Sequence, residues 1–265
     1  MSHDQSPPDG IDTGTPHVAR IYDYVLGGKN NYAVDREYAD KIVAQVPDYP
    51  GLARANRLFL SRSVEFMAQA GIRQFIDLGA GIPTPPNVHE IARETHPEAR
   101  VVYVDNDPIV SVHNDVLLAT DSRLISIRAD LREPQDVLAH PDLLRLIDFD
   151  EPVGVLFIAV LQLFPGREEP ARIIAPFRER MVEGSHLAIA QPSAEGSQEA
   201  VERARAALSG GPVPVDLRKH EEILPFFDGF ELVEPGLVDI TRWRPRMEAP
   251  STGMIVLGGV GRKSV

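Results

Sequence analysis

The stretch Phe75-Ile-Asp-Leu-Gly-Ala-Gly-Ile-Pro83, followed by Val101-Val-Tyr-Val-Asp-Asn-Asp-Pro108, decides how the chain folds. The first segment predicts a short apolar strand that enters a glycine turn. The second predicts another apolar strand that ends on a carboxylate. Together they are typical of one half of a nucleotide-binding α/β unit. Gly79 and Gly81 tolerate the φ values that such a turn needs, and without a Cβ they let the backbone approach a ligand.

The carboxylate at the end of the second segment indicates what the ligand contains. Asp105 lies 24 positions after Gly81, where the second strand's end places a carboxylate beside a ribose. Hydrogen bonds from two ribose hydroxyls to one carboxylate are charge-assisted and contribute roughly 1.5–3 kcal/mol each. We therefore expect a ribonucleoside ligand.

Two versions of this unit compete. A dinucleotide fold needs G-x-G-x-x-G, but Thr84 stands at the third glycine, and three prolines at 83, 85 and 86 remove donors from a pyrophosphate site. A turn for S-adenosylmethionine (SAM) needs an acidic residue before the glycines, and Asp77 with Gly79, Ala80 and Gly81 fits it. Asp77 attracts the ammonium group of SAM and would repel a pyrophosphate. The pattern favours SAM over a nicotinamide cofactor, and over a turn that binds nothing.

Composition limits the remaining classes. The 265 residues suit one large domain, alone or with a small appendage, and the absence of Cys excludes disulfides and suits a cytoplasmic protein. A net charge of −12 disfavours nucleic acid and leaves a small molecule as the expected partner. The longest uncharged apolar run, 153–164, is too short for a membrane span. No metal site is predicted, because the H-E-x-x-H pattern at 89 fails at Arg93.

The pattern along the chain predicts one doubly wound domain behind a helical N-terminal segment. Residues 1–15 are predicted to be disordered, 16–70 to form a helical lid, and 71–265 to form the ligand-binding domain. Within 16–70 we expect two helices joined by a glycine loop at 27–31 and a third helix over 51–70. Strands are expected at 74–78, 100–104, 124–129, 153–160, 186–190, 231–238 and 254–260. Helices are expected near 87–96, 108–119, 135–146, 168–182, 198–208 and 216–227.

Further candidate residues follow the later strands. Asp130 and Leu131 stand where the third strand ends, so they can contact an adenine, although Asp130 also suits an N-cap of the next helix. The fourth strand's end, around Ala159, is expected to form the floor under the reacting methyl group. Gln162 is the only polar side chain of that run, and it is either a substrate contact or a satisfied core amide.

The N-terminal segment is rich in groups that can act at a site. We expect it to fold over the pocket, exclude water and select the acceptor. The methionine carboxylate of SAM has four candidate partners: Arg20, Arg36, Asn56 and Arg57. A general base is needed only if the acceptor arrives protonated, and the weak candidates are Tyr22, Asp23 and Tyr32.

Four motifs together resemble one known family. They are the segment from Arg20 to Asn31, Arg54-Ala-Asn-Arg57, the Asp77–Thr84 turn with Asn87-Val-His-Glu90, and Tyr103-Val-Asp-Asn-Asp-Pro108. The chain resembles the actinobacterial SAM-dependent methyltransferases that were long classed as a domain of unknown function. The resemblance covers nearly the whole chain.

The resemblance implies a class I methyltransferase fold, with a Rossmann-like, seven-stranded, mostly parallel sheet whose last strand is antiparallel. It also implies SAM as cofactor and S-adenosylhomocysteine as product. In that fold Asn106, with Asp130 and Leu131, is expected at the adenine. It implies no substrate. A non-catalytic protein that binds SAM or S-adenosylhomocysteine, and an NAD(P)-dependent oxidoreductase, remain as alternatives.

Overall fold

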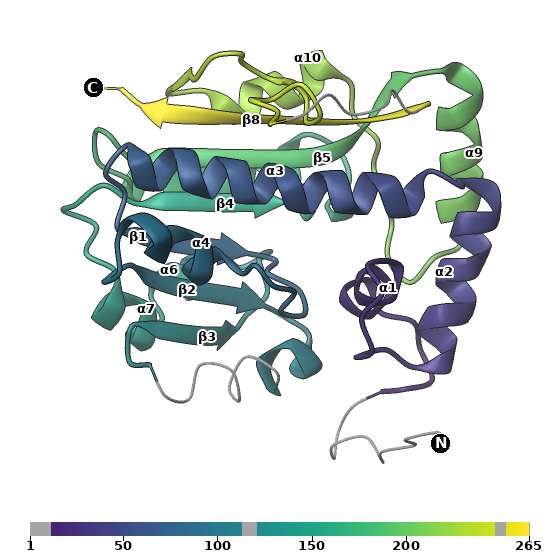
Figure 1. Ribbon diagram of the computed structural model, residues 1–265, viewed down its shortest axis with the longest axis horizontal. Helices are drawn as coiled ribbons and strands as arrows, with labels where there is room; N and C mark the ends of the chain where they lie inside the picture. The colour runs from purple at the N-terminus through teal and green to yellow at the C-terminus, as the bar shows by residue number, and fades with distance from the viewer. Residues whose placement is uncertain (1–11, 113–120, 247–252, 265) are drawn as a thin grey trace.

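The computed structural model describes residues 12–112, 121–246 and 253–264, and its centre is one mixed β-sheet (Figure 1). Its strands run in the spatial order β3-β2-β1-β4-β5-β8-β6, and a short β7 also pairs with β8. Their bounds are β1 Gln74–Leu78, β2 Arg100–Asp105, β3 Leu124–Arg128, β4 Gly154–Ile158, β5 His186–Gly196, β6 Phe230–Leu232, β7 Val238–Asp239 and β8 Met254–Lys263.

Strands β1 to β5 pair in parallel, and β8 runs antiparallel to its neighbours β5 and β6. The mixed sheet predicted from the sequence is confirmed, with one strand more than expected. The parallel strands need crossovers, and helices supply them on both faces. All carboxyl ends of β1 to β4 therefore lie at one edge of the sheet (Figure 1).

Successive residues of each strand are buried against opposite layers. Phe75, Val101 and Leu156 face a core with the long helix α3 (Tyr49–Gln69) and with α4 (Val88–Thr95), whereas Ile76 and Val102 face the other core. The second layer contains α6 (Pro134–Leu138), α7 (Pro141–Leu146), α8 (Glu168–Arg180), α10 (His220–Ile223) and the 3₁₀ turn η2 (Leu224–Phe227). Burial on both faces explains why these strands read as continuous apolar runs.

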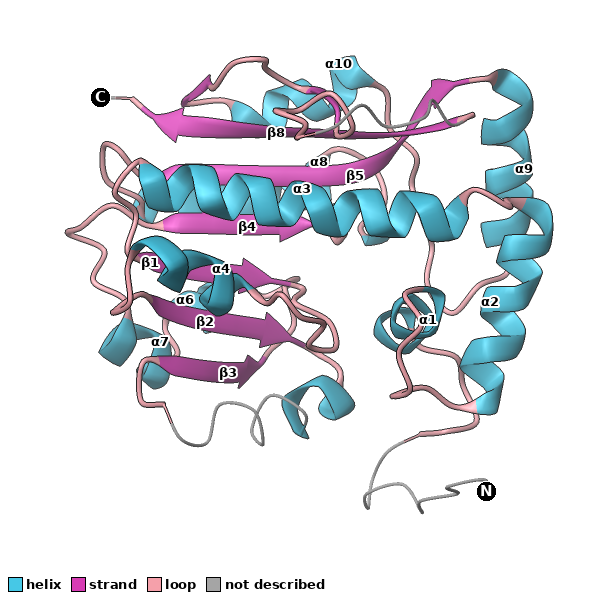
Figure 2. Ribbon diagram, viewed as in Figure 1, coloured by secondary structure: helices cyan, strands magenta, loops and turns pink. Residues whose placement is uncertain are grey.

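Three helices stand beyond the carboxyl edge of the sheet: α1 (Val18–Val25), α2 (Ala33–Gln45) and α9 (Gln198–Leu208) (Figures 1 and 2). Helix α2 packs against α9, so two segments far apart in sequence form one wall. The third helix of the expected N-terminal lid, α3, instead lies along the face of the sheet (Figure 1). Of the predicted lid segment, only α1, α2 and the start of α3 lie beside the strand ends.

The following four sequence predictions are among those that differ from the structure, and prolines or turns explain three of the four. The helix expected at 135–146 is divided into α6 and α7, because Pro141 begins α7 and leaves His140 extended. The helix expected at 216–227 is reduced to α10 and η2, whose second residue is Pro225. The strand expected at 231–238 is interrupted by a turn at Glu234 and Pro235, which a hydrogen bond from the Gly236 amide to the Val233 carbonyl closes. Strand β4 ends at Ile158 instead of residue 160, because Ala159 has a φ of +56°.

Two predicted segments lie partly outside the described residues. The tail expected to be disordered, 1–15, is described only from Asp12, where residues 12–15 make hydrogen bonds to the Asp12 carboxylate and to Arg20. The helix expected at 108–119 begins at Pro108 and is described to residue 112. Within the described ranges, every helix is too short or too polar to cross a bilayer.

Candidate functional site

A cavity of about 550 Å³ lies between the carboxyl edge of the sheet and the helices beyond it. This volume is in the range of small-molecule sites. We name two parts of its lining by their composition. The acidic side comprises Asp77, the turn Gly79–Ile82, Asp105, Asn106 and Ala129–Arg132. The apolar chamber comprises Tyr38, Ile42, Val46, Tyr49, Leu52, Ala204, Leu208, Pro212, Val213, Pro214, Val215, Leu217, Met254 and Val256.

The glycine turn follows β1 as predicted, but its two glycines serve different purposes. Both have positive φ, +73° at Gly79 and +65° at Gly81. A Cβ on Gly79 would lie 2.4 Å from the Val160 side chain, whereas a Cβ on Gly81 would meet open space. The first glycine is therefore required for packing under the turn, although both glycines line the cavity. Only Gly81 leaves room beside the cavity.

Asp105, at the end of β2, ties the two segments together. One carboxylate oxygen accepts a hydrogen bond of 2.8 Å from the Gly81 amide, and the other accepts one of 2.9 Å from the Asp107 amide. Each oxygen keeps a further lone pair, because an ionised carboxylate offers about four acceptor positions. Burial raises the pKa of Asp105, and the two amides act in the opposite direction. The carboxylate can thus hold the turn and still accept ribose hydroxyls.

Asp77, in β1, is a buried carboxylate that accepts no hydrogen bond from the described residues, and it lines the cavity. Burial raises the pKa of Asp77 to about 7; Arg57 counteracts this shift, and Asp105 adds to it. A buried carboxylate without a partner is costly in free energy. This site is therefore suited to a cationic group that enters the cavity.

The far end of the acidic side carries the residues that were predicted at an adenine. Asn106, Asp130 and Leu131 all line the cavity, and Leu131 also packs into the core. Asp130 pairs with Arg132 at 2.6 Å, and its hydrogen bond from that guanidinium holds its pKa below the usual range. The alternative of an N-cap is not observed, because Glu133 occupies the N-cap of α6.

Helix α3 brings Asn56 and Arg57 to the cavity, as expected. Arg57 Nη2 donates to the carbonyls of Thr84 and Pro86, at 2.5 and 2.8 Å, so it clamps the proline-rich loop. The Asn56 amide nitrogen donates to the Tyr22 hydroxyl at 3.0 Å, and its buried Oδ1 has no partner. Asn56 therefore offers an acceptor, which does not suit the carboxylate that the sequence analysis assigned to it.

Three residues predicted at the site do not line the cavity: Arg20, Tyr32 and Arg36. Arg20 is buried and donates to the carbonyls of Asp12 and Thr15, and its Nε lies 3.5 Å from Asp35. Its guanidinium also lies 5.4 Å from the centre of the Tyr32 ring. Arg36 is exposed and donates to Asn31. These contacts stabilise the N-terminal segment, so we assign none of the three a role at the cofactor.

Tyr22 and Asp23 border the cavity but already have partners. The Tyr22 hydroxyl donates to the Ala53 carbonyl at 3.0 Å, and burial raises its pKa. Asp23 Oδ2 accepts 2.8 Å hydrogen bonds from the Asn30 amide and the Asn31 side chain. Asp23 therefore shapes the glycine loop between α1 and α2. With Tyr32 outside the cavity, the three sequence candidates for a general base all have structural roles.

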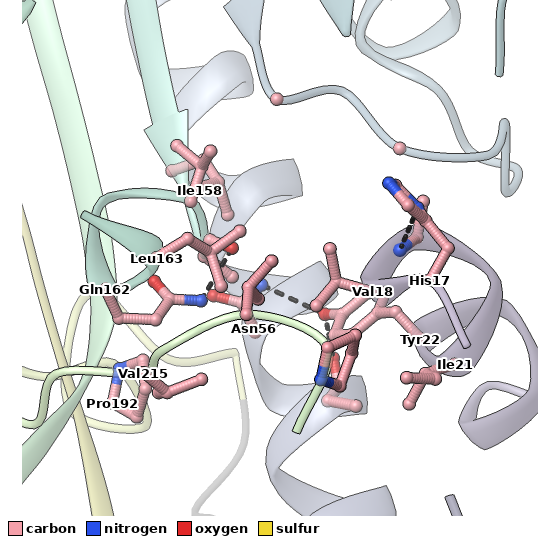
Figure 3. A pocket seen from close by; sticks show the side chains of 18 of the residues that line it. His17, Val18, Ile21, Tyr22, Asn56, Ile158, Gln162, Leu163, Pro192 and Val215 are labelled. Carbon is pink, nitrogen blue, oxygen red and sulfur yellow. Dashed lines mark hydrogen bonds between the residues drawn. The ribbon is translucent and has the colours of Figure 1, made fainter. Parts of the chain in front are cut away.

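Gln162 lies in the 3₁₀ turn η1 (Leu161–Leu163) at the cavity (Figure 3). Its Nε2 donates to the Ala159 carbonyl at 2.7 Å, and its buried Oε1 has no partner. Ala159 lines the cavity in a left-handed conformation, which costs roughly 1–2 kcal/mol in a residue with a Cβ. The buried Arg218 donates to Leu161 and Gly166 carbonyls and so holds this loop. The strained backbone of Ala159 and the Gln162 Oε1 acceptor therefore lie in the same turn.

The sequence analysis did not predict the apolar chamber. Its walls come from α2, the start of α3, α9, the segment after Gly211 and the beginning of β8. The available signal was the apolar run from Pro212 to Val215, directly after Gly210 and Gly211, where no element was expected. His17 was also missed; it lines the cavity with Nδ1 2.8 Å from Asp107.

Known proteins resemble this chain in sequence and in structure. A family model described as S-adenosyl methyltransferase matches residues 4–264. The crystal structure of a Thermobifida fusca YX protein, assigned as a methyltransferase, is similar with 38% sequence identity and a TM-score of 0.92; the match covers 98% of this chain and 100% of that one. A DUF574 family protein from Streptomyces avermitilis MA-4680 is similar with 39% identity and a TM-score of 0.91, over 96% and 99% of the two chains. No curated protein sequence matches.

Proposed function

The chain belongs to the S-adenosyl methyltransferase family, and from that premise we propose that it methylates a small-molecule acceptor held in the cavity described above. The resemblance predicted from the sequence motifs is confirmed, and so is SAM as the cofactor. One observation carries the proposed site. Three carboxylates, Asp77, Asp105 and Asp130, from or just beyond three successive strands, line one side of a single cavity.

The residues fit the two ends of the cofactor. Asp77, a buried carboxylate that accepts no hydrogen bond from the described residues, and Asn56 Oδ1, which has no partner among them, are acceptors suited to an ammonium group. The Nη1 and Nε atoms of Arg57 make no hydrogen bond within the described residues, so they can take the neighbouring carboxylate. We assign the ribose to Asp105, and the adenine to Asn106 with Asp130 and Leu131.

When bound, SAM supplies a methyl group on a positively charged sulfur; transfer forms the acceptor–carbon bond, leaves S-adenosylhomocysteine and releases the acceptor's proton. The protein's part is to align the two reactants and to exclude water. Holding reactants in such a geometry lowers a barrier by roughly 7–11 kcal/mol without a covalent intermediate. The turn from Ala159 to Gln162 forms the surface against which the reactants would be aligned. Arg218 holds this turn by donating to the Leu161 carbonyl.

The experiment is methyl transfer from methyl-labelled SAM to a fractionated metabolite extract. We expect label in at least one small-molecule fraction with the intact protein, and none with Asp105→Ala. Tight binding of S-adenosylhomocysteine with no labelled product would instead favour a non-catalytic binding protein. Binding of NADH in preference to S-adenosylhomocysteine would favour an oxidoreductase. Thr84 and the prolines of the turn argue against this outcome, because they do not suit a dinucleotide site.

A further inference from the structure

The apolar chamber differs from the rest of the cavity in having no charge. The acidic, basic and histidine lining residues within the described ranges belong to the acidic side, to α1 and the residue before it, to α3, or to the start of α8. They are His17, Asp23, Arg57, Asp77, Asp105, Asp130, Arg132 and Glu169. Every described residue of the apolar chamber is aliphatic, proline, methionine or tyrosine. A charged acceptor entering this chamber would lose its hydration without a compensating partner.

The tyrosines of the chamber add no charge to it. Burial raises the pKa of Tyr38 and of Tyr49, so both hydroxyls stay neutral at physiological pH. The chamber is also closed by packing: Ile42 and Leu208 belong to the cluster that joins α2 to α9, and Val46, Leu52 and Leu217 belong to the main core. The walls thus offer apolar contact and few polar anchors, which is the usual character of a site for an apolar ligand.

Gln162 supplies the polar anchor. Its orientation is fixed, because Nε2 donates to the Ala159 carbonyl and the opposite assignment would place two oxygens together. Oε1 is then a buried acceptor without a partner among the described residues, and it belongs to a residue that is 8% exposed and lines the cavity. An unsatisfied buried acceptor is costly in free energy, and a donor on the bound acceptor molecule can recover that cost. Figure 3 shows this amide beside Leu163, Pro192 and Val215.

We propose that the methyl acceptor is an uncharged, largely apolar molecule that fills the apolar chamber and donates an N–H or O–H hydrogen bond to Gln162 Oε1. This inference rests on the proposed function, because it names the substrate class of the same site. Gln162 is then a specificity-determining residue. It distinguishes an acceptor that still carries its proton from the methylated product, which has lost the donor.

The test uses matched pairs of neutral aromatic probes on the full-length protein saturated with S-adenosylhomocysteine. Each pair has one member with a donor and one with that donor methylated: phenol and anisole, indole and N-methylindole, 2-naphthol and 2-methoxynaphthalene. A charged probe, naphthalene-2-sulfonate, completes the set. Affinities are measured by calorimetry or ligand-observed NMR. We expect the donor member of at least one pair to bind tenfold or more tightly than its methylated partner, and the sulfonate not to bind.

Two variants assign the discrimination to the amide. Gln162→Met keeps the length of the side chain and removes Oε1, so the tenfold preference should fall to about one. Gln198→Met makes the same change at an exposed glutamine of α9, and it should keep the full preference.

Three results would overturn the inference: no probe binds, the sulfonate binds as well as the neutral probes, or the preference survives in Gln162→Met. The failure of the proposed function looks different, because the protein would then either not retain S-adenosylhomocysteine or retain it and transfer no label to any fraction, whichever probes the chamber binds.

Discussion

The acidic side and the apolar chamber share one cavity but are built in opposite ways. The acidic side comes from residues at or just beyond the ends of neighbouring strands, so a local motif in the sequence already places Asp77, Asp105 and Gly81. The chamber is assembled from α2, α9, the segment after Gly211 and β8, which are distant in sequence. In the proposed assignment, charges fixed on the sheet recognise the cofactor, and a surface that only packing creates recognises the acceptor.

The two regions also differ in what burial does to them. On the acidic side, burial raises the pKa of Asp77 and Asp105, so the ligand-free protein holds carboxylates whose charge is disfavoured. In the chamber, burial of aliphatic side chains is favourable without any ligand, at roughly 25 cal/mol per Å². The acidic side is therefore the part of the cavity whose stability depends on pH and on the bound cofactor.

The largest effect is expected from Asp105→Ala. It removes both ribose hydrogen bonds, roughly 1.5–3 kcal/mol each, together with the contact to the Gly81 amide. The dissociation constant for S-adenosylhomocysteine, measured by calorimetry, should rise more than 100-fold. Leu208→Ala, in the chamber, is the matched variant and should change that constant by less than about twofold. Equal losses in both variants would mean that the two regions do not bind separate ligands.

An intermediate effect is expected from Asp77→Asn. The folded-state pKa of about 7 lies above the ordinary value of 3.8, so the folded protein retains a proton that the unfolded chain releases between these pH values. The ligand-free protein should therefore lose stability as the pH rises from 4 to 7, by at most about 1.36 kcal/mol per pH unit for this group. Asp77→Asn should remove this slope from melting curves recorded over that range.

The same carboxylate should give cofactor binding a pH dependence. An ammonium group favours the ionised form of Asp77, so affinity for S-adenosylhomocysteine should increase as the pH rises through 7. Asp77→Asn should bind about tenfold more weakly at pH 8 and show a flatter profile. A profile that is equally steep in the variant would exclude Asp77 as its source.

The last prediction concerns the stability of the acidic side alone and separates the two glycines of its turn. Gly79→Ala adds a strained φ to a contact with Val160, and we expect a loss of roughly 2–4 kcal/mol in the free energy of unfolding. Gly81→Ala meets open space and should lose only about 1–2 kcal/mol. Urea denaturation measures both. The double variant Gly79→Ala, Val160→Ala should regain part of the loss; if it regains none, the packing explanation fails.

Much of the acidic side could be predicted because its chemistry is local. A strand, a turn with positive φ and a second strand place their ends at one edge by the geometry of parallel pairing, whatever surrounds them. Asp77, Gly81, Asp105, Asn106, Asp130 and Leu131 were all placed at the cavity in this way. The residue types at these positions also carry their own chemical signal, since a carboxylate at a strand end suggests a ribose.

In the N-terminal segment, residue type did not predict which side chains reach the cavity. From residue type alone, three side chains of this segment are equally able to bind a ligand: Arg20, Tyr22 and Arg36. In the structure, however, Arg20 binds backbone carbonyls, Tyr22 reaches the cavity and Arg36 is exposed. Which side of a helix meets the cavity depends on how α1 and α2 dock, and residue type does not encode that docking. Arg20, predicted at the methionine carboxylate, does not line the cavity for this reason.

The sequence by itself determined the order of strands and helices, the glycine turn and the carboxylates of the acidic side, because these depend on periodicity and on residues close in the chain. Only the tertiary structure decided that Asn56 presents an oxygen, that Gln162 keeps an unpaired acceptor, and that α2, α9 and β8 enclose an uncharged chamber. The physical reason is that hydrogen-bond partners and cavity walls are relations between distant segments, and these relations exist only after the segments pack.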